Sequence, residues 1–125
     1  MAPGGVNLFV IGLNHRTAPL ALRERLAIPP RDLPAALTSL RACSGVTEAV
    51  ILSTCNRVEL YVVSDDPAPS VQGLVDFLSH ASRLSPSAFQ THLYTHEGQA
   101  AADHLFRVAA GLDSMIPTAF LQVAA

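Results

Sequence analysis

The sequence of 125 residues lacks several features that would indicate particular classes of protein. No apolar run approaches the ~20 residues that a membrane-spanning helix needs, so we predict no transmembrane segment. Residues 1–6 lack the basic and apolar regions of a signal peptide, and we expect them to form a flexible tail. The chain has only two cysteines, and nothing suggests secretion. We therefore expect a cytosolic protein whose thiols are reduced.

Charged residues are also scarce, at 14% of the chain with a formal net charge of −2. A dedicated nucleic-acid binder usually carries a basic patch, and this balance does not predict one. The sequence contains no Gly-x-Gly-x-x-Gly fingerprint, so it predicts no dinucleotide site. Its histidines and cysteines lack the close paired spacing of a zinc site, so we predict no structural metal.

Half of the residues are hydrophobic, and their spacing predicts an α+β domain. Apolar runs rich in β-branched residues predict strands at 7–11, 48–52 and 58–63. Helical spacing predicts helices from near Pro19, from near Asp32, over 71–78, after Ser85 and over roughly 99–112, while 93–96 fits either a helix end or a short strand. We expect one βαββα-type domain, with a small antiparallel sheet and helices packed on one face.

A short polar segment, residues 53–57, separates two of the predicted strands and reads Ser-Thr-Cys-Asn-Arg. It would lie at a hairpin tip, where a rigid sheet holds side chains that reach solvent. Cys55 is a candidate nucleophile there, because a nearby cation lowers the pKa of a thiol. Arg57 can supply that cation, or it can hold a substrate carboxylate in a bidentate grip. Alternatively, Cys55 is a small apolar residue that closes a strand end.

Two other places carry polar side chains of interest. Asn14, His15 and Arg16 follow the first predicted strand, and they would open on the same sheet edge as Cys55 if the two strands are neighbours. The alternative is a solvated turn whose polar groups satisfy the backbone. His104 borders the apolar stripe of the last predicted helix, where a histidine is either structural and partly buried or directed toward the sheet edge.

Three segments, in this order and spacing, carry a resemblance to a known family. They read Gly-Leu-Asn-His-Arg-Thr-Ala-Pro at 12–19, Ser-Thr-Cys-Asn-Arg-Val-Glu-Leu-Tyr at 53–61 and Gly-Leu-Asp-Ser-Met at 111–115. The chain thus resembles the N-terminal catalytic domain of glutamyl-tRNA reductase, the first committed enzyme of tetrapyrrole (porphyrin) synthesis from glutamate. The resemblance implies a catalytic-type domain over 7–115 and a divergent tail over 116–125, with the NADPH-binding and dimerisation domains absent.

The resemblance also implies a mechanism. A cysteine thiolate attacks the glutamyl ester of tRNA, and NADPH reduces the resulting thioester to glutamate-1-semialdehyde. The substrate would be glutamyl-tRNA, and family members form homodimers through a region absent here. No residue of this chain would bind the cofactor. The implied catalytic residues are Cys55 and His104, and the implied substrate-binding residues are Thr54, Asn56, Arg57 and Ser114.

Other functions remain open at this point. Residues 116–125 depart from the family pattern, which a truncated or frame-shifted gene would produce. The chain would then be an inactive truncated fragment or a non-catalytic binding module. A generic thiol hydrolase is a further alternative, and it would need a contact between Cys55 and a histidine but no preference for glutamate.

Overall fold

The structure is a computed structural model, and it describes residues 7–64, 71–111 and 121–124, with only the backbone described for the last range. The expected N-terminal tail and Ser114 lie outside the described residues. Within them, no helix is long and apolar enough to cross a membrane.

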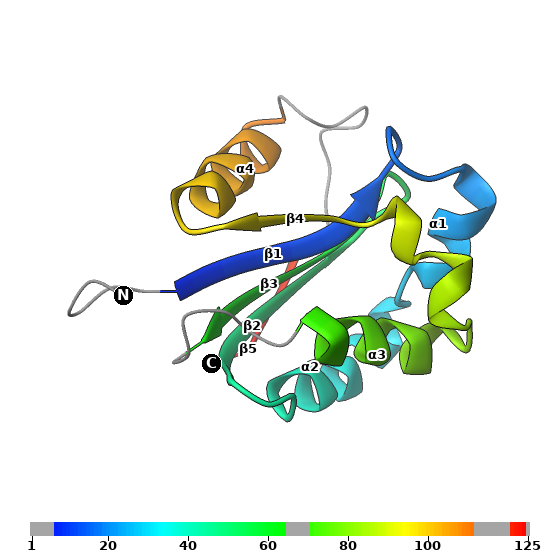
Figure 1. Cartoon of the computed structure of the whole chain (residues 1–125), viewed down its shortest axis with the longest axis horizontal. Coiled ribbons are helices and arrows are strands. Elements are labelled where there is room, and N and C mark those ends of the chain that lie inside the picture. Colours follow the sequence, from blue (N-terminus) through cyan, green and yellow to red (C-terminus); the bar gives the residue numbers. More distant parts are fainter. Residues whose placement is uncertain (1–6, 65–70, 112–120, 125) are drawn as a thin grey trace.

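A five-stranded antiparallel sheet forms the centre of the domain (Figure 1). Its strand order is β4-β1-β3-β2-β5, and each described pairing is antiparallel. The three predicted strands are present, and the first of them continues to Asn14. Residues 121–124, which the sequence placed in a divergent tail, pair with β2 as the edge strand β5. The bounds are β1 Asn7–Asn14, β2 Val46–Ser53, β3 Arg57–Ser64, β4 Tyr94–Glu97 and β5 Leu121–Ala124.

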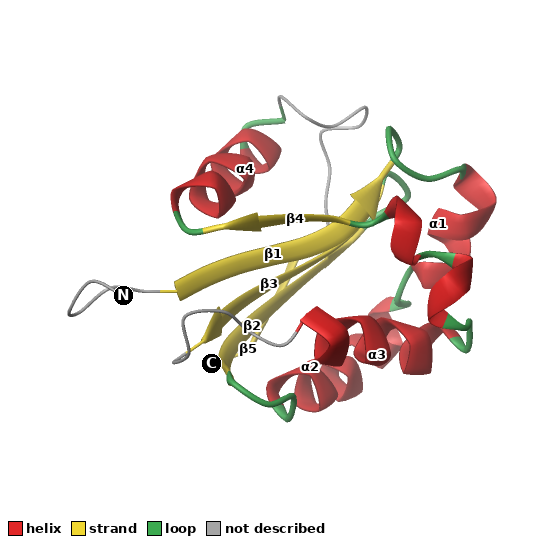
Figure 2. Cartoon of the chain, in the orientation of Figure 1, coloured by secondary structure: helices red, strands yellow, loops and turns green. Residues whose placement is uncertain are grey.

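Helices lie on both faces of this sheet, with α4 on the face opposite to α1, α2 and α3 (Figure 2). The α+β class is confirmed, and α1, α2 and α3 cover one face as expected. In addition, α4 packs on the opposite face, because both faces of β3 carry buried side chains and both need cover. The bounds are α1 Leu20–Leu26, α2 Leu33–Arg41, α3 Val71–Ser82 and α4 Gln99–Ala109, with 3-10 turns η1 Pro30–Asp32, η2 Pro86–Ala88 and η3 Gln90–His92.

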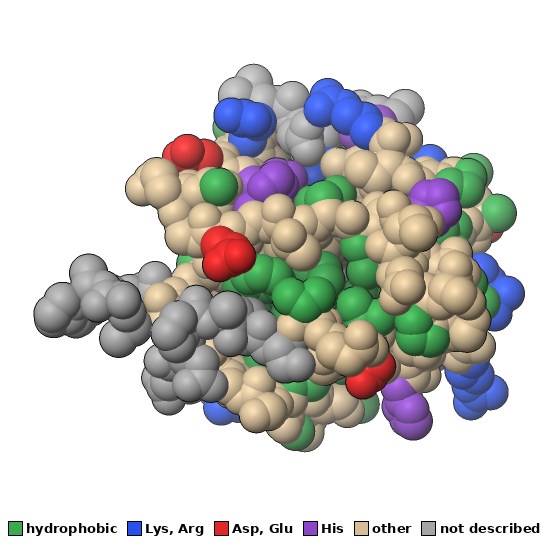
Figure 3. Space-filling view, in the orientation of Figure 1, with side chains coloured by type: hydrophobic (Ala, Val, Ile, Leu, Met, Phe, Trp, Pro, Cys, Tyr) green, Lys and Arg blue, Asp and Glu red, His purple; other side chains and the backbone are tan. Residues whose placement is uncertain are grey.

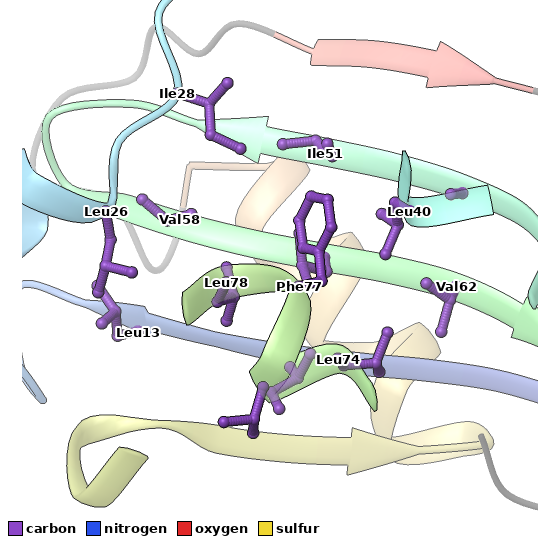
Figure 4. Close-up of a cluster of buried hydrophobic side chains, with 14 of the residues drawn as sticks. Leu13, Leu26, Ile28, Leu40, Ile51, Val58, Val62, Leu74, Phe77 and Leu78 are labelled. Carbon is purple, nitrogen blue, oxygen red and sulfur yellow. The ribbon is translucent and has the colours of Figure 1, made fainter. Parts of the chain in front are cut away.

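The main core lies between the sheet and α1, α2 and α3 (Figure 4). Inward residues of the strands meet the apolar stripes of the helices there, and full burial of each large side chain contributes about 1.5–3 kcal/mol. A second, smaller cluster forms under α4 from Val10, Leu52, Tyr61, Ala101 and Val108. The side chains that Figure 4 labels in the main core are Leu13, Leu26, Ile28, Leu40, Ile51, Val58, Val62, Leu74, Phe77 and Leu78.

Two local expectations about helix ends and stripes differ from the structure. Aspartate is a preferred N-cap residue, so the sequence predicts that Asp32 caps the helix that begins near it. It makes no side-chain cap for α2, because the turn η1 already leads the backbone into the helix. The apolar stripe expected to begin at Val71 begins one turn later, since Val71 is exposed and Phe77 is buried instead.

Gly12 in β1 is required by a close approach between neighbouring strands. It pairs with Glu59 of β3 and with Tyr94 of β4. A Cβ atom at position 12 would lie 2.4 Å from the carbonyl oxygen of Val58 and 2.8 Å from Cγ of Glu59. The Glu59 side chain of β3 therefore passes over Gly12 of β1, where there is no side chain, and reaches Tyr94 of β4.

We predict that Gly12→Ala lowers the free energy of unfolding by about 1–3 kcal/mol, because the added methyl group forces the two strands apart. Urea unfolding followed by circular dichroism measures the change. Thr95→Ala, an exposed change on β4, serves as the control and should stay within about 0.5 kcal/mol of the parent chain. Equal stability of Gly12→Ala and the parent would contradict this packing.

Candidate functional site

The hairpin between β2 and β3 turns tightly over residues 54–56. The backbone N–H of Thr54 donates to the carbonyl oxygen of Arg57 at 2.8 Å. Thr54 Oγ1 accepts the backbone N–H groups of Asn56 and Arg57 at 3.1 and 3.2 Å. The threonine hydroxyl thus fixes the turn, as hydroxyl side chains often do. This geometry holds Cys55 at the tip between two strands whose adjoining ends are buried.

Cys55 is exposed at this tip, as a nucleophile must be, and is not packed in the core. Its Sγ lies 3.9 Å from Oδ1 of Asn56. Arg23 of α1 also contacts Cys55, because its Nη1 donates to the carbonyl oxygen of Cys55 at 2.7 Å. The other cysteine, Cys43, is half-buried beyond the end of α2, and burial raises the pKa of its thiol.

The buried carboxylate of Glu59 is hydrogen-bonded by several polar side chains on the sheet face that α4 covers. Arg57 Nη1 donates to its Oε2 at 3.2 Å, and the hydroxyl of Tyr61 donates to its Oε1 at 2.7 Å. The hydroxyl of Tyr94 donates to Oε2 as well. Nε2 of His104 lies 2.5 Å from the same oxygen. Residues from β3, β4 and α4 therefore meet on one side chain that is fully shielded from solvent.

The environment keeps this carboxylate ionised. Burial by itself would raise the pKa of Glu59, but the hydrogen bonds from His104, Tyr94 and Tyr61 outweigh burial and hold its pKa below the ordinary value. Burial and then the negative charge of Glu59 raise the pKa of Tyr94, which therefore stays a protonated donor. Since an ionised carboxylate only accepts hydrogen bonds, Nε2 of His104 carries the proton that lies between them. The other ring nitrogen, Nδ1, is then the one through which a neutral His104 can accept a proton.

The structure brings some of the expected site residues together and separates others. Arg57 and His104 meet on Glu59, although Arg57 is almost completely buried. Cys55 lies four residues from Glu59 along β3, a span of no more than about 14 Å. Among the described residues, no hydrogen bond joins Cys55 Sγ to His104; the described partner of that sulfur is Asn56.

The first loop lies where the sequence predicted it to lie if β1 and β3 were neighbours. Asn14 and Arg57 are register partners, so the loop after β1 and the Cys55 hairpin lie side by side at the same end of the sheet. Asn14 Oδ1 accepts the backbone N–H groups of Arg16 and Thr17 at 2.9 and 3.2 Å. The Asn14 side chain therefore stabilises the turn, as in the alternative interpretation.

Comparisons with known proteins place this geometry in a family. The sequence model described as "Glutamyl-tRNAGlu reductase, N-terminal domain" matches residues 11–118. The chain belongs to this family. The chain is 50% identical over 111 residues to a glutamyl-tRNA reductase of Solibacter usitatus and 49% identical over 111 residues to one of Alkalilimnicola ehrlichii, and each match covers 89% of this chain. It spans only 26% and 24% of these relatives, which is about a quarter of their length.

A solved structure of a family member has the same fold. Glutamyl-tRNA reductase from Methanopyrus kandleri aligns with a TM-score of 0.61 and 27% sequence identity, over 86% of this chain and 23% of the other. The chain is thus a glutamyl-tRNA reductase N-terminal domain by sequence and by fold. In the part of the chain that the structure describes, no three His, Cys, Asp or Glu side chains come together in a group that could hold a metal ion.

Reasoning from the sequence missed four residues of this N-terminal domain site, which are Glu59, Tyr61, Tyr94 and Arg23. Glu59 had a detectable signal, because a glutamate two residues after Arg57 inside an apolar strand must share its face and pair with it. Tyr94 and Arg23 had no such signal. Their contacts join segments 35 and 32 residues apart, and only the packing of the sheet and α1 determines them.

We predict that Glu59→Gln lowers the free energy of unfolding at neutral pH by about 1–3 kcal/mol, because it removes charge-assisted hydrogen bonds. The folded pKa of Glu59 lies below its ordinary value, so its stabilisation is complete above that value and is lost as pH falls through the folded pKa. The difference between the parent chain and Glu59→Gln should therefore shrink below about pH 4. Urea unfolding at pH 7 and at lower pH measures it.

The matched control is Glu48→Gln, which changes an exposed glutamate on β2. Its stability should follow that of the parent chain across the same pH range. A gap between the parent and Glu59→Gln that stays constant with pH would contradict the buried ionised state of Glu59.

Proposed function

We propose that this domain catalyses the acyl-transfer half of the glutamyl-tRNA reductase reaction, with Cys55 as the nucleophile. The observation that carries the proposal is an exposed thiol at the tip of a rigid hairpin in a domain of this family. The buried strand ends on both sides fix the position of the tip. Its backbone is fixed by the N–H of Asn56, which donates to Thr54 Oγ1, and by Arg23, which donates to the carbonyl oxygen of Cys55. A reactive group on such a support needs little reorganisation when a substrate binds.

In the proposed step, the Cys55 thiolate attacks the ester carbonyl that joins glutamate to the ribose of tRNA. A carbon–sulfur bond forms and the carbon–oxygen bond to the ribose breaks. The proton that leaves the thiol is delivered to the ribose oxygen, which departs as a hydroxyl. The product is a glutamyl thioester on Cys55, whose carbonyl is more electrophilic than that of the oxygen ester. This is covalent catalysis that divides one difficult step into two.

The neighbouring polar side chains have proposed roles in this step. His104 manages the proton of the thiol or of the leaving oxygen, and the carboxylate of Glu59 sets its ring orientation. Arg57 is proposed from the family resemblance to bind a carboxylate of the substrate, which requires its buried contact with Glu59 to open. Asn56 orients the acyl group beside the sulfur. Ser114 is proposed as a further substrate contact, and it lies outside the described residues.

Reduction of the thioester requires NADPH in the family, and the described residues do not fit that cofactor. A dinucleotide site is built at the first turn of a parallel β-α-β unit with a glycine fingerprint. Here each described strand pairing is antiparallel, and the sequence contains no such fingerprint. We therefore derive no hydride step from these residues. Reduction and homodimer formation are proposed for the regions of the relatives that this chain does not span, and a cytosolic location is proposed with them.

Labelled glutamyl-tRNA tests the thioester directly. We expect a covalent glutamyl adduct on the chain, detected by mass spectrometry, or faster deacylation than in buffer. Cys55→Ser should abolish both, because the serine hydroxyl is not ionised near neutral pH. Cys43→Ser is the matched control and should retain the adduct, since that thiol is half-buried at another place in the fold.

Absence of an adduct and of deacylation with the parent chain would instead favour the non-catalytic module or an inactive fragment. Equal activity with alanyl-tRNA would favour the generic thiol hydrolase.

We also predict that His104→Gln slows adduct formation by roughly 10²–10⁴-fold, the usual contribution of a positioned acid–base group. Single-turnover rates with labelled glutamyl-tRNA measure the effect. His80→Gln, an exposed change on α3, is the control and should leave the rate unchanged. A rate for His104→Gln within a factor of two or so of the parent would remove His104 from the chemistry.

A further inference from the structure

A pocket of 390 Å³ borders the hairpin tip on the side of the sheet that α1 covers. Ser53, Thr54 and Cys55 form one wall, and Arg23 stands at its rim. The pocket is fixed in place because the backbone N–H of Ile28 donates to Ser53 Oγ at 3.0 Å. Its volume lies within the ordinary range of small-molecule sites, about 300–1,000 Å³.

The other walls of this pocket are mostly apolar. They come from the end of α1 and the start of α2, and they present mainly flat proline rings and aliphatic side chains. The exposed carboxylate of Glu24 also lines the pocket. The apolar part of this surface accepts the face of an aromatic base. The apolar lining residues are Ala27, Ile28, Pro29, Pro30 and Leu33.

Arg23 gives this pocket one fixed positive charge, beside the exposed carboxylate of Glu24. Its Nε donates to the carbonyl oxygen of Ala18 at 3.1 Å, and its Nη1 donates to that of Cys55 at 2.7 Å. A guanidinium carries five N–H donors, so these two contacts hold the group while others remain for an anion. Held in this way, the planar fork suits the bidentate binding of a phosphate.

Basic side chains gather around the same segment. Residues 14–32 contain four of the eight basic residues of the chain, all arginines, against two acidic ones, although the whole chain is slightly acidic. Arg16, Arg25 and Arg31 are exposed. Figure 3 shows arginine side chains at the surface on the side where α1 lies. The rim of the pocket therefore attracts a polyanion locally, which the overall charge of −2 conceals.

The proposed thioester step determines what must lie beside the sulfur. The carbonyl under attack is bonded to the ribose of the last nucleotide, so that nucleoside has to occupy a space that borders Cys55. The opposite side of the sheet holds the Arg57–Glu59–His104 group, to which the proposed function assigns the glutamyl part. The apolar pocket is left for the nucleoside.

We propose that this pocket receives the terminal adenosine of the tRNA, with its base against the proline and aliphatic walls and the phosphate on its 5′ side bound by Arg23. The inference rests on the proposed thioester function. In this arrangement the two parts of the substrate lie on opposite sides of the hairpin tip, the amino acid on the α4 side of the sheet and the nucleotide on the α1 side.

The test compares two acyl donors, glutamyl-tRNA and a small glutamyl thioester that has no nucleotide. With Arg23→Ala we expect the concentration of glutamyl-tRNA that gives half-maximal adduct formation to rise about tenfold or more, as for loss of one charge-assisted contact. The salt dependence should weaken by roughly one phosphate contact. The rate with the small thioester measures any loosening of the hairpin tip, and it should fall much less than the response to glutamyl-tRNA. Arg41→Ala, at the exposed end of α2, is the matched control and should change neither.

Equal losses with both donors would show that Arg23 only braces the hairpin, and an unchanged response to glutamyl-tRNA would also overturn the proposal. If the parent chain reacts with neither donor, the thioester function fails, and a direct measurement separates the two ideas. Adenosine 5′-monophosphate added to the Cys55→Ser chain should shift the amide resonances of Ala27, Ile28 and residue 55. The absence of shifts there at millimolar nucleotide would overturn the pocket assignment by itself.

Discussion

The site depends on one buried carboxylate and on the space that one glycine leaves for it. Taking Glu59 out of water costs several kcal/mol, which only well-placed hydrogen bonds offset. Here the donors come from β3, β4 and α4, so the charge can be buried only when all three elements are in place. Gly12 provides the room, because a side chain there would collide with Glu59. Folding of the sheet and assembly of the polar group are therefore one event.

This coupling explains why the polar group lies under α4 and away from the large core. Side chains alternate along β3, so Val58, Leu60 and Val62 enter the main core while Arg57, Glu59 and Tyr61 enter the opposite face. The main core supplies most of the apolar burial and makes the hairpin rigid. Because the hairpin is rigid, the charged side chains on the second face keep fixed positions. The small apolar cluster under α4 covers them on one side.

The hairpin tip lies between these two faces. Cys55 projects from it, with a polar group on the α4 side and an apolar, arginine-rimmed pocket on the α1 side. A substrate that joins a charged amino acid to a nucleotide would meet different chemistry on each side of the sulfur. A thiol at the end of a sheet, unlike one within a strand, is accessible from both sides, which is what the proposed role of Cys55 requires.

The sequence by itself determined the strands β1, β2 and β3, the helical stripes, the exposed turn with Cys55 and the family, because these depend on local periodicity and on short motifs. It indicated that the loops after β1 and β2 would lie together only if the strands were neighbours, and the pairing of β1 with β3 in the structure met that condition. The sequence could not show that α4 crosses to the other face, that Glu59 joins Arg57 to His104, or that Arg23 reaches the carbonyl of Cys55. Those contacts join segments far apart in the chain, and only the packing of the sheet and helices brings them together.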